Sequence, residues 1–170
     1  MRMNPNDFFE AFVQGNFEDY QLNIGSVRLA FNASISASHM ADHYYWYCKK
    51  YNPTKVMSFI NHNDFIEYIS QNTNHCFRDI RSISNAYKHL YTSVDPRKAV
   101  HITISSAGAI ESISFPDKKS DLNKIEEQLS SDTNIDNQNT KVVFTRKDGQ
   151  KIEFLPTLKT VIEFWGKLLN

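Results

Sequence analysis

The sequence predicts an α+β domain that is mostly α, with an N-terminal helical bundle, a small antiparallel β segment and a C-terminal helix. The 170 residues match the usual size of one domain. Apolar residues recur at helical spacing over 1–92, which also hold 17 of the 22 aromatic residues. After Asp95-Pro96 the pattern alternates as strands do. We therefore expect a single domain over 1–170, with the bundle in 1–92 and a hairpin-containing extension with a closing helix in 93–170.

The first helices of the bundle are predicted from capping residues and apolar spacing. Asn4-Pro5-Asn6-Asp7 indicates a helix start, and Gly15 is expected to end or weaken that first helix. The longest periodic segment runs from Ser26 to Tyr51. Asn52-Pro53 is expected to end it, because proline cannot continue a helix.

Two more helices complete the predicted bundle. Asn61-His62-Asn63-Asp64 is a capping pattern before one of them, and the other should run from about His75 to Tyr91. We expect His62, which lies beside a helix cap, and His101, which lies in a predicted strand, to be structural residues. The apolar face of the second helix is predicted to consist of Cys76, Ile80, Ile83, Tyr87 and Leu90.

The extension is predicted to contain strands, a loop and a helix. Val100 to Ile104 alternates as a strand, and strands at 141–145 and 151–154 bracket the turn signal Asp148-Gly149. Residues 130–140 are polar and are predicted to form a loop. The closing helix is predicted to bury Leu158, Val161, Ile162, Trp165 and Leu168.

Charge and cysteine content exclude several classes of protein. The 19 basic and 19 acidic residues cancel, as eight against eight in 1–92 and eleven against eleven in 93–170. A broadly basic nucleic-acid-binding surface is therefore excluded, and any such site must be small and local. Cys48 and Cys76 fit two buried thiols in a reducing compartment. Since no apolar run is long enough to cross a bilayer, we expect a cytoplasmic protein without a membrane partner.

Two predicted helices each carry a polar stripe without Glu, which is the main functional signal of the sequence. Such residue types aim hydrogen bonds at a defined target, whereas a solvated face, the plain alternative, uses mostly Lys and Glu. Antiparallel packing would bring the histidines of the first stripe toward Asn85 and His89. Trp46 lies on the same side as those histidines and is a candidate ligand or dimer contact. The first stripe consists of Arg28, Asn32, Ser36, His39 and His43, and the second of Arg78, Ser82, Asn85 and His89, flanked by Arg81 and Lys88.

The run from Arg78 to His89, RDIRSISNAYKH, resembles the Arg-and-His helix of HEPN domains, which are small helical bundles of prokaryotic toxin and phage-defence systems. Active members of that family are metal-independent ribonucleases, with four to six residues between the Arg and the His, and other members only bind. Here seven residues separate Arg81 from His89, and Ser82 takes the polar position after the Arg. The resemblance therefore implies either a ribonuclease or an RNA-binding protein.

The resemblance also implies roles for individual residues, without a metal or another cofactor. His89 would act as general base or acid in transesterification of RNA, and Arg81 or Arg78 would stabilise the charge on the phosphoryl oxygens. Asn85 would orient His89 or the phosphate. A homodimer would bring two copies of the pair to one cleft. Further residues expected to bind RNA are Arg78, Lys88, Arg28, Asn32, His39 and His43.

Two other functions compete with this interpretation. The chain is alternatively a non-catalytic interaction module, antitoxin-like or a scaffold, that offers the edge of its hairpin to a protein partner. The third interpretation is a metal site, because His39 and His43 stand at i and i+4 and His75, His89 or Asp42 could complete it.

Overall fold

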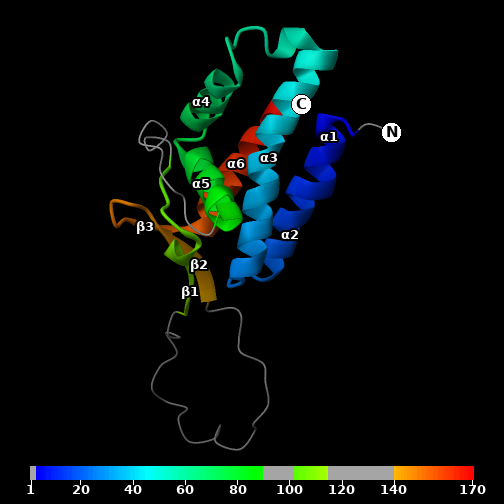
Figure 1. Cartoon of the computed structure of the whole chain (residues 1–170). Coiled ribbons are helices and arrows are strands. Elements are labelled where there is room, and N and C mark those ends of the chain that lie inside the picture. Colours follow the sequence, from blue (N-terminus) through cyan, green and yellow to red (C-terminus); the bar gives the residue numbers. More distant parts are fainter. Residues whose placement is uncertain (1–2, 90–101, 115–139) are drawn as a thin grey trace, which may run out of the picture.

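The computed structural model describes residues 3–89, 102–114 and 140–170. It is mostly helical, with a three-stranded antiparallel sheet at one end and a C-terminal helix packed into the bundle (Figure 1). The predicted α+β class, with helices dominant, is therefore confirmed. None of the described helices combines the length and the apolar character that crossing a bilayer requires.

The chain starts with a long, irregular helical segment. It comprises α1 (Pro5–Phe8), the π-helical turn η1 (Phe9–Gln14) and α2 (Gly15–Leu22). The Asn4 side chain caps it by accepting a hydrogen bond from the Asp7 amide. Gly15 was expected to end or weaken this helix; it does not end it, because Gly15 keeps helical dihedral angles and the helix continues as α2. Beyond it Phe17 and Tyr20 are buried, and this burial outweighs the roughly 1 kcal/mol that a helical glycine costs.

The central helix, α3 (Val27–Tyr51), has the predicted bounds. The Ser26 side chain caps its start by accepting a hydrogen bond from the Leu29 amide, and the helix ends at Asn52, before the 3₁₀ turn η2 (Pro53–Lys55). Its core-facing side is rich in small residues, which allow close helix packing around larger side chains such as Met40 and Tyr44.

Two shorter helices pack against α3. In α4 (His62–Asn72) the Asn61 side chain accepts hydrogen bonds from the first backbone amides, as the capping pattern predicted. Helix α5 (Cys76–His89) runs antiparallel to α3, because its Arg81 contacts Asp42 while its later Tyr87 ring contacts the earlier Phe31, at 4.9 Å.

The apolar face of α5 is rotated from the predicted one. Ile80 and Ile83 are fully buried as predicted, but Tyr87 is 51% exposed. Phe77 and Ala86 are buried in its place, since the helix faces both α3 and the C-terminal helix. Leu90, also predicted on this face, lies outside the described residues.

The sheet consists of β1 (Ile110–Ser114), β2 (Thr140–Thr145) and β3 (Lys151–Glu153), in the order β1-β2-β3. Phe144 of β2 pairs with Ile110 on one side and with Ile152 on the other. The predicted hairpin between β2 and β3 is confirmed, and Gly149 adopts φ +87°, which only glycine tolerates readily. The predicted loop at 130–140 lies outside the described residues except for Thr140, which begins β2.

The strand predicted at 100–104 is not observed in its described part. Ile102 to Ile104 form no strand, and residues 100 and 101 lie outside the described residues. The Thr103 amide donates to the Ser82 hydroxyl at 3.0 Å, and the Thr103 carbonyl accepts from the Lys147 amide at 2.9 Å. The hydrogen-bonding groups of this backbone are thus paired with α5 and with the hairpin turn. The strand that completes the sheet lies further along the chain, at β1.

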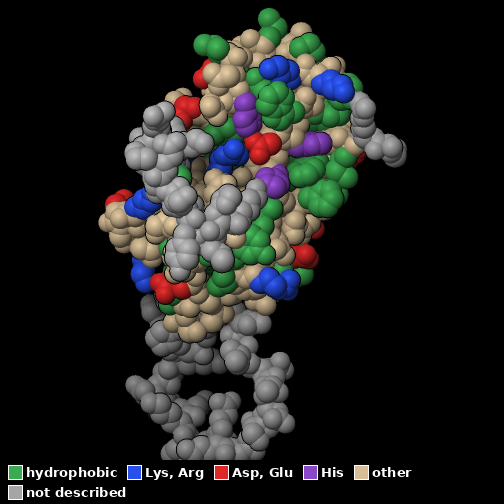
Figure 2. Space-filling view, in the orientation of Figure 1, with side chains coloured by type: hydrophobic (Ala, Val, Ile, Leu, Met, Phe, Trp, Pro, Cys, Tyr) green, Lys and Arg blue, Asp and Glu red, His purple; other side chains and the backbone are tan. Residues whose placement is uncertain are grey.

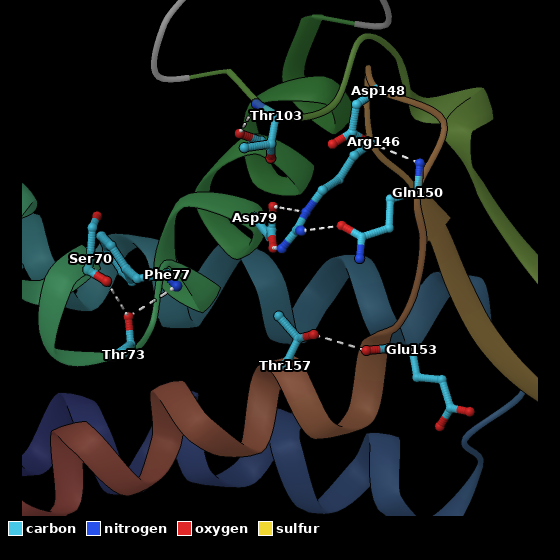
Figure 3. Close-up of polar contacts among 11 residues, drawn as sticks. Ser70, Thr73, Phe77, Asp79, Thr103, Arg146, Asp148, Gln150, Glu153 and Thr157 are labelled. Atoms are coloured by element: carbon cyan, nitrogen blue, oxygen red, sulfur yellow. Dashed lines mark hydrogen bonds and ion pairs between the residues drawn. The ribbon is translucent and has the colours of Figure 1, made fainter.

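The C-terminal helix α6 (Phe154–Leu169) closes the core as predicted, with Leu158, Val161, Ile162 and Trp165 buried. The sheet is tied to the bundle by an ion pair between Arg146, just after β2, and the buried Asp79 of α5 (Figure 3). This link fixes the orientation of α5, which presents Arg81 on its other side to α3.

Candidate functional site

One face of α3 carries a concentrated group of polar and aromatic side chains. Helical spacing places His39, Asp42, His43 and Trp46 on this face, since they stand within two turns of one another. Figure 2 shows histidine side chains gathered around an acidic side chain, with Lys or Arg and hydrophobic side chains beside them. The fold therefore gathers titratable and aromatic groups on one surface rather than scattering them.

A groove of about 660 Å³ lies along this face, between α1 and α3. It continues into a second hollow of about 320 Å³, with which it shares Phe8 and His39, and which reaches Asn32 and Ser36. The walls of the main groove are mostly aromatic. They are formed by Met3, Phe8, His39, Asp42, His43, Trp46, Tyr47 and Tyr51.

Aromatic contacts hold the groove in shape. The His43 ring stacks on Phe8 with centroids 4.7 Å apart, and lies 6.1 Å from the Tyr47 ring. The His43 Nε2 is buried and has no hydrogen-bond partner among the described residues. Trp46, in contrast, is 54% exposed, and the Lys49 ammonium lies 5.1 Å from its ring centroid. The groove thus offers one large, half-exposed aromatic ring with a cation over it.

Asp42 joins three helices at the edge of the groove. Its Oδ1 lies 3.0 Å from Nε2 of His62, the first residue of α4, and 3.5 Å from Nη1 of Arg81 on α5. The two side chains are close enough to form an ion pair, but their geometry does not meet the criteria of a hydrogen bond. The His62 ring also contacts Tyr45 at 5.1 Å and stacks against Trp46 at 5.9 Å.

This environment sets the protonation of His62. Burial lowers the pKa of its imidazole most strongly; the Asp42 carboxylate raises that pKa, and the Arg81 guanidinium lowers it further. The net pKa is below the ordinary value of 6.5, so the ring is mainly neutral at pH 7. A neutral imidazole can accept a proton, which is what a general base requires.

The first predicted stripe is only partly gathered at the groove. His39 and His43 line it, and Asn32 lines its continuation. Arg28 is exposed at the start of α3. Ser36 is buried, and its hydroxyl donates to the Asn32 and Ala33 carbonyls of its own helix. Its lack of a charged head and its small size allow it to lie inward.

The second predicted stripe does not face the first as a continuous row. Arg78 turns toward α4, where its Nη2 donates to both carboxylate oxygens of Glu67, at 2.7 and 2.8 Å. Ser82 is buried against Thr103, and Asn85 is half-buried on α5. Arg81 joins the group through Asp42. The side chains of Lys88 and His89 lie outside the described residues.

The described residues contain no group of three His, Cys, Asp or Glu side chains that is able to hold a metal ion. His75, one of the proposed ligands, is exposed in the turn before α5, with φ +65°. The metal-binding alternative therefore has no support in this part of the chain.

His62 is the site residue that the sequence interpretation missed, because its partners lie sixteen and twenty positions earlier in the chain, at Trp46 and Asp42. One signal was present: Asp42 stands at i+3 from His39, on the polar side of the same helix. Comparison with known protein families, with curated proteins and with solved structures found no match for this chain.

Proposed function

We propose that this chain is an HEPN-like, RNA-directed protein that binds single-stranded RNA in the α3 groove. The observation that carries the proposal is Trp46, an exposed aromatic ring with the Lys49 ammonium over it, on a groove that is also lined by two imidazoles. Proteins that bind single strands stack bases on such rings and place cations along the phosphates.

The dimensions and charges of the groove suit such a ligand. A volume of about 660 Å³ is within the range of sites that hold a small organic ligand. Lys49 and Arg81 flank Trp46 and Asp42 and supply local positive charge. A balanced overall charge is compatible with this mode, because stacking supplies about 1–3 kcal/mol per base independently of charge.

The polar wall favours RNA over DNA. The Asp42 carboxylate accepts hydrogen bonds, and His39 and His43 line the same wall with imidazoles, which can donate and accept. A ribose 2′-hydroxyl is both a donor and an acceptor and is the group that such side chains recognise. The resemblance of α5 to HEPN domains adds the expectation of a homodimer with a toxin or defence role.

Intrinsic fluorescence tests the proposal directly, because the chain has two tryptophans and Trp165 is fully buried. Titration with a short unstructured RNA should quench the Trp46 emission as a base stacks on the ring. Trp46→Phe should abolish the quenching while an RNA carrying its own dye still binds.

Trp46→Ala should weaken binding of the dye-labelled RNA about 5- to 150-fold, which corresponds to one lost stacking contact of 1–3 kcal/mol. Leu22→Ser is the matched control, since Leu22 is 86% exposed but does not line the groove. The proposal fails if RNA binds wild type and Trp46→Ala equally, or if no RNA binds.

A further inference from the structure

The contact group of His62, Asp42 and Arg81 lies directly beside the groove. Asp42 and Trp46 are groove residues, and both touch His62. A nucleotide bound at Trp46 would therefore lie beside the His62 ring, which packs against the same indole. We propose that His62, positioned by Asp42, is the general base of RNA strand cleavage at this site. This inference rests on the proposed binding of RNA in the groove.

The orientation of the ring assigns a role to each nitrogen of His62. Its Nε2 is buried 3.0 Å from an oxygen of the Asp42 carboxylate, which can only accept, so our assignment places the proton of the neutral ring on that nitrogen. Its Nδ1 is then the nitrogen that accepts a proton from substrate. As the ring becomes positively charged, the Asp42 carboxylate at 3.0 Å stabilises it.

Arg81 supplies the positive charge that a phosphate requires. Its guanidinium contacts the same Asp42 oxygen at 3.5 Å, and no other ion pair or hydrogen bond of this side chain falls among the described residues. One carboxylate oxygen thus contacts both the imidazole and the guanidinium. The polar surface near Trp46 therefore combines a proton acceptor, an orienting carboxylate and a stabilising guanidinium.

The reaction is a transesterification within the RNA strand. His62 takes the proton of the ribose 2′-hydroxyl, and the 2′-oxygen forms a bond to the adjacent phosphorus. The bond from phosphorus to the 5′-oxygen of the next nucleotide breaks, and that oxygen takes a proton from water. The products are a 2′,3′-cyclic phosphate and a 5′-hydroxyl, and His62 returns its proton to solvent. The reaction as written requires no oxidant, metal ion or second substrate.

This assignment differs from the roles that the α5 pattern implies. Within α5 the eight positions from Arg81 to His89 span about 12 Å, too far for the pair to act on one phosphate within a single chain. His62 and Arg81, in contrast, share one oxygen of Asp42. His62→Gln and His89→Gln therefore distinguish the two assignments, because each substitution removes the proposed base of only one of them.

The experiment uses the full chain and a 5′-labelled DNA oligonucleotide that contains one ribonucleotide, with an all-DNA oligonucleotide beside it. Wild type should cut the first after the ribonucleotide, in the presence of EDTA, and leave the second intact. Mass spectrometry should find a cyclic phosphate end. His62→Gln should cut at least about 100-fold more slowly, the loss typical of a missing general base, with Leu22→Ser, outside the groove, as the control that retains cleavage.

Binding of the same oligonucleotides, followed by Trp46 fluorescence, is measured for every variant. Asp42→Asn removes the charge that raises the His62 pKa, so it should shift the acidic limb of the pH–rate profile to lower pH, which a merely structural residue would not do. Wild type that binds but does not cut overturns this inference and leaves the binding proposal intact. Cleavage that survives His62→Gln also overturns it, and cleavage that is lost in His89→Gln but kept in His62→Gln assigns the reaction to α5 instead. Absence of binding both to these oligonucleotides and to the short unstructured RNA defeats both proposals.

Discussion

The ion pair between Asp79 and Arg146 offers the sharpest test of how the sheet is attached to the bundle. The Asp79 side chain on α5 is 1% exposed, and Arg146 contacts both of its carboxylate oxygens, with Nε to Oδ1 at 3.1 Å. The Arg146 guanidinium also donates to the Gln150 side chain at 2.6 Å. Hydrogen bonding to Asp79 raises the pKa of Arg146, so the cation persists at every accessible pH.

Replacing Arg146 by Ala leaves the Asp79 carboxylate buried without its partner. Removing one partner of a buried ion pair typically costs 3–5 kcal/mol, so we expect the free energy of unfolding to fall by about that amount. A domain of this size has roughly 5–15 kcal/mol in total, so the variant should be marginally stable. Urea denaturation followed by circular dichroism measures the difference.

A double variant separates the pair from simple loss of packing. Asp79→Leu with Arg146→Met removes both charges and keeps the volume, so it should be more stable than Arg146→Ala alone. The reasoning is refuted if Arg146→Ala lowers the free energy of unfolding by less than about 1 kcal/mol, the value of an exposed pair. It is also refuted if the double variant is the less stable of the two.

Three further predictions concern pH, packing and thiol reactivity. Because burial lowers the pKa of His62 below 6.5, the unfolded chain binds a proton at this residue more readily than the folded chain, so the free energy of unfolding should fall as the pH drops below 6.5. In His62→Gln this part of the pH dependence, measured by urea titration at several pH values, should be absent. The same dependence of the unfolding free energy on pH in wild type and variant would contradict the prediction. Gly25→Ala would bring the new Cβ against the hydroxyl and the Cβ of Thr140, and should lower the free energy of unfolding by about 1–3 kcal/mol. Adding Thr140→Gly removes the clash and should restore part of that loss, as followed by thermal unfolding. A double variant no more stable than Gly25→Ala would contradict the prediction. Burial raises the thiol pKa of Cys48 and of Cys76, so iodoacetamide should modify both more slowly in the native than in the urea-unfolded chain, and equal rates would contradict this.

Local signals predicted the elements of the fold that local chemistry determines. The apolar period of α3, the asparagine cap of α4 and the Asp148-Gly149 turn are all set by residues within one element. Where the prediction was wrong, distant contacts decided. Gly15 stays helical because Phe17 and Tyr20 are buried beyond it, and Thr103 bonds to α5 and to the hairpin turn rather than to a strand.

The candidate site could be predicted only in part for the same reason. His39 and His43 share one helix face, so periodicity alone places them together. Ser36 shares that face and yet is buried, because its hydroxyl bonds to its own helix. The contact of His62 with Asp42 depends on where α4 returns to the bundle, which no local pattern contains.

Photochemical cross-linking tests the central claim most directly, because it locates RNA on the protein. A short RNA that contains 4-thiouridine is irradiated with the full chain, and the cross-linked tryptic peptide is identified by mass spectrometry. The account predicts cross-links in the peptide 29–49, which carries His39, His43, Trp46 and Tyr47 without an internal Lys or Arg. Cross-links confined to the peptides of the sheet and of α6 would contradict it.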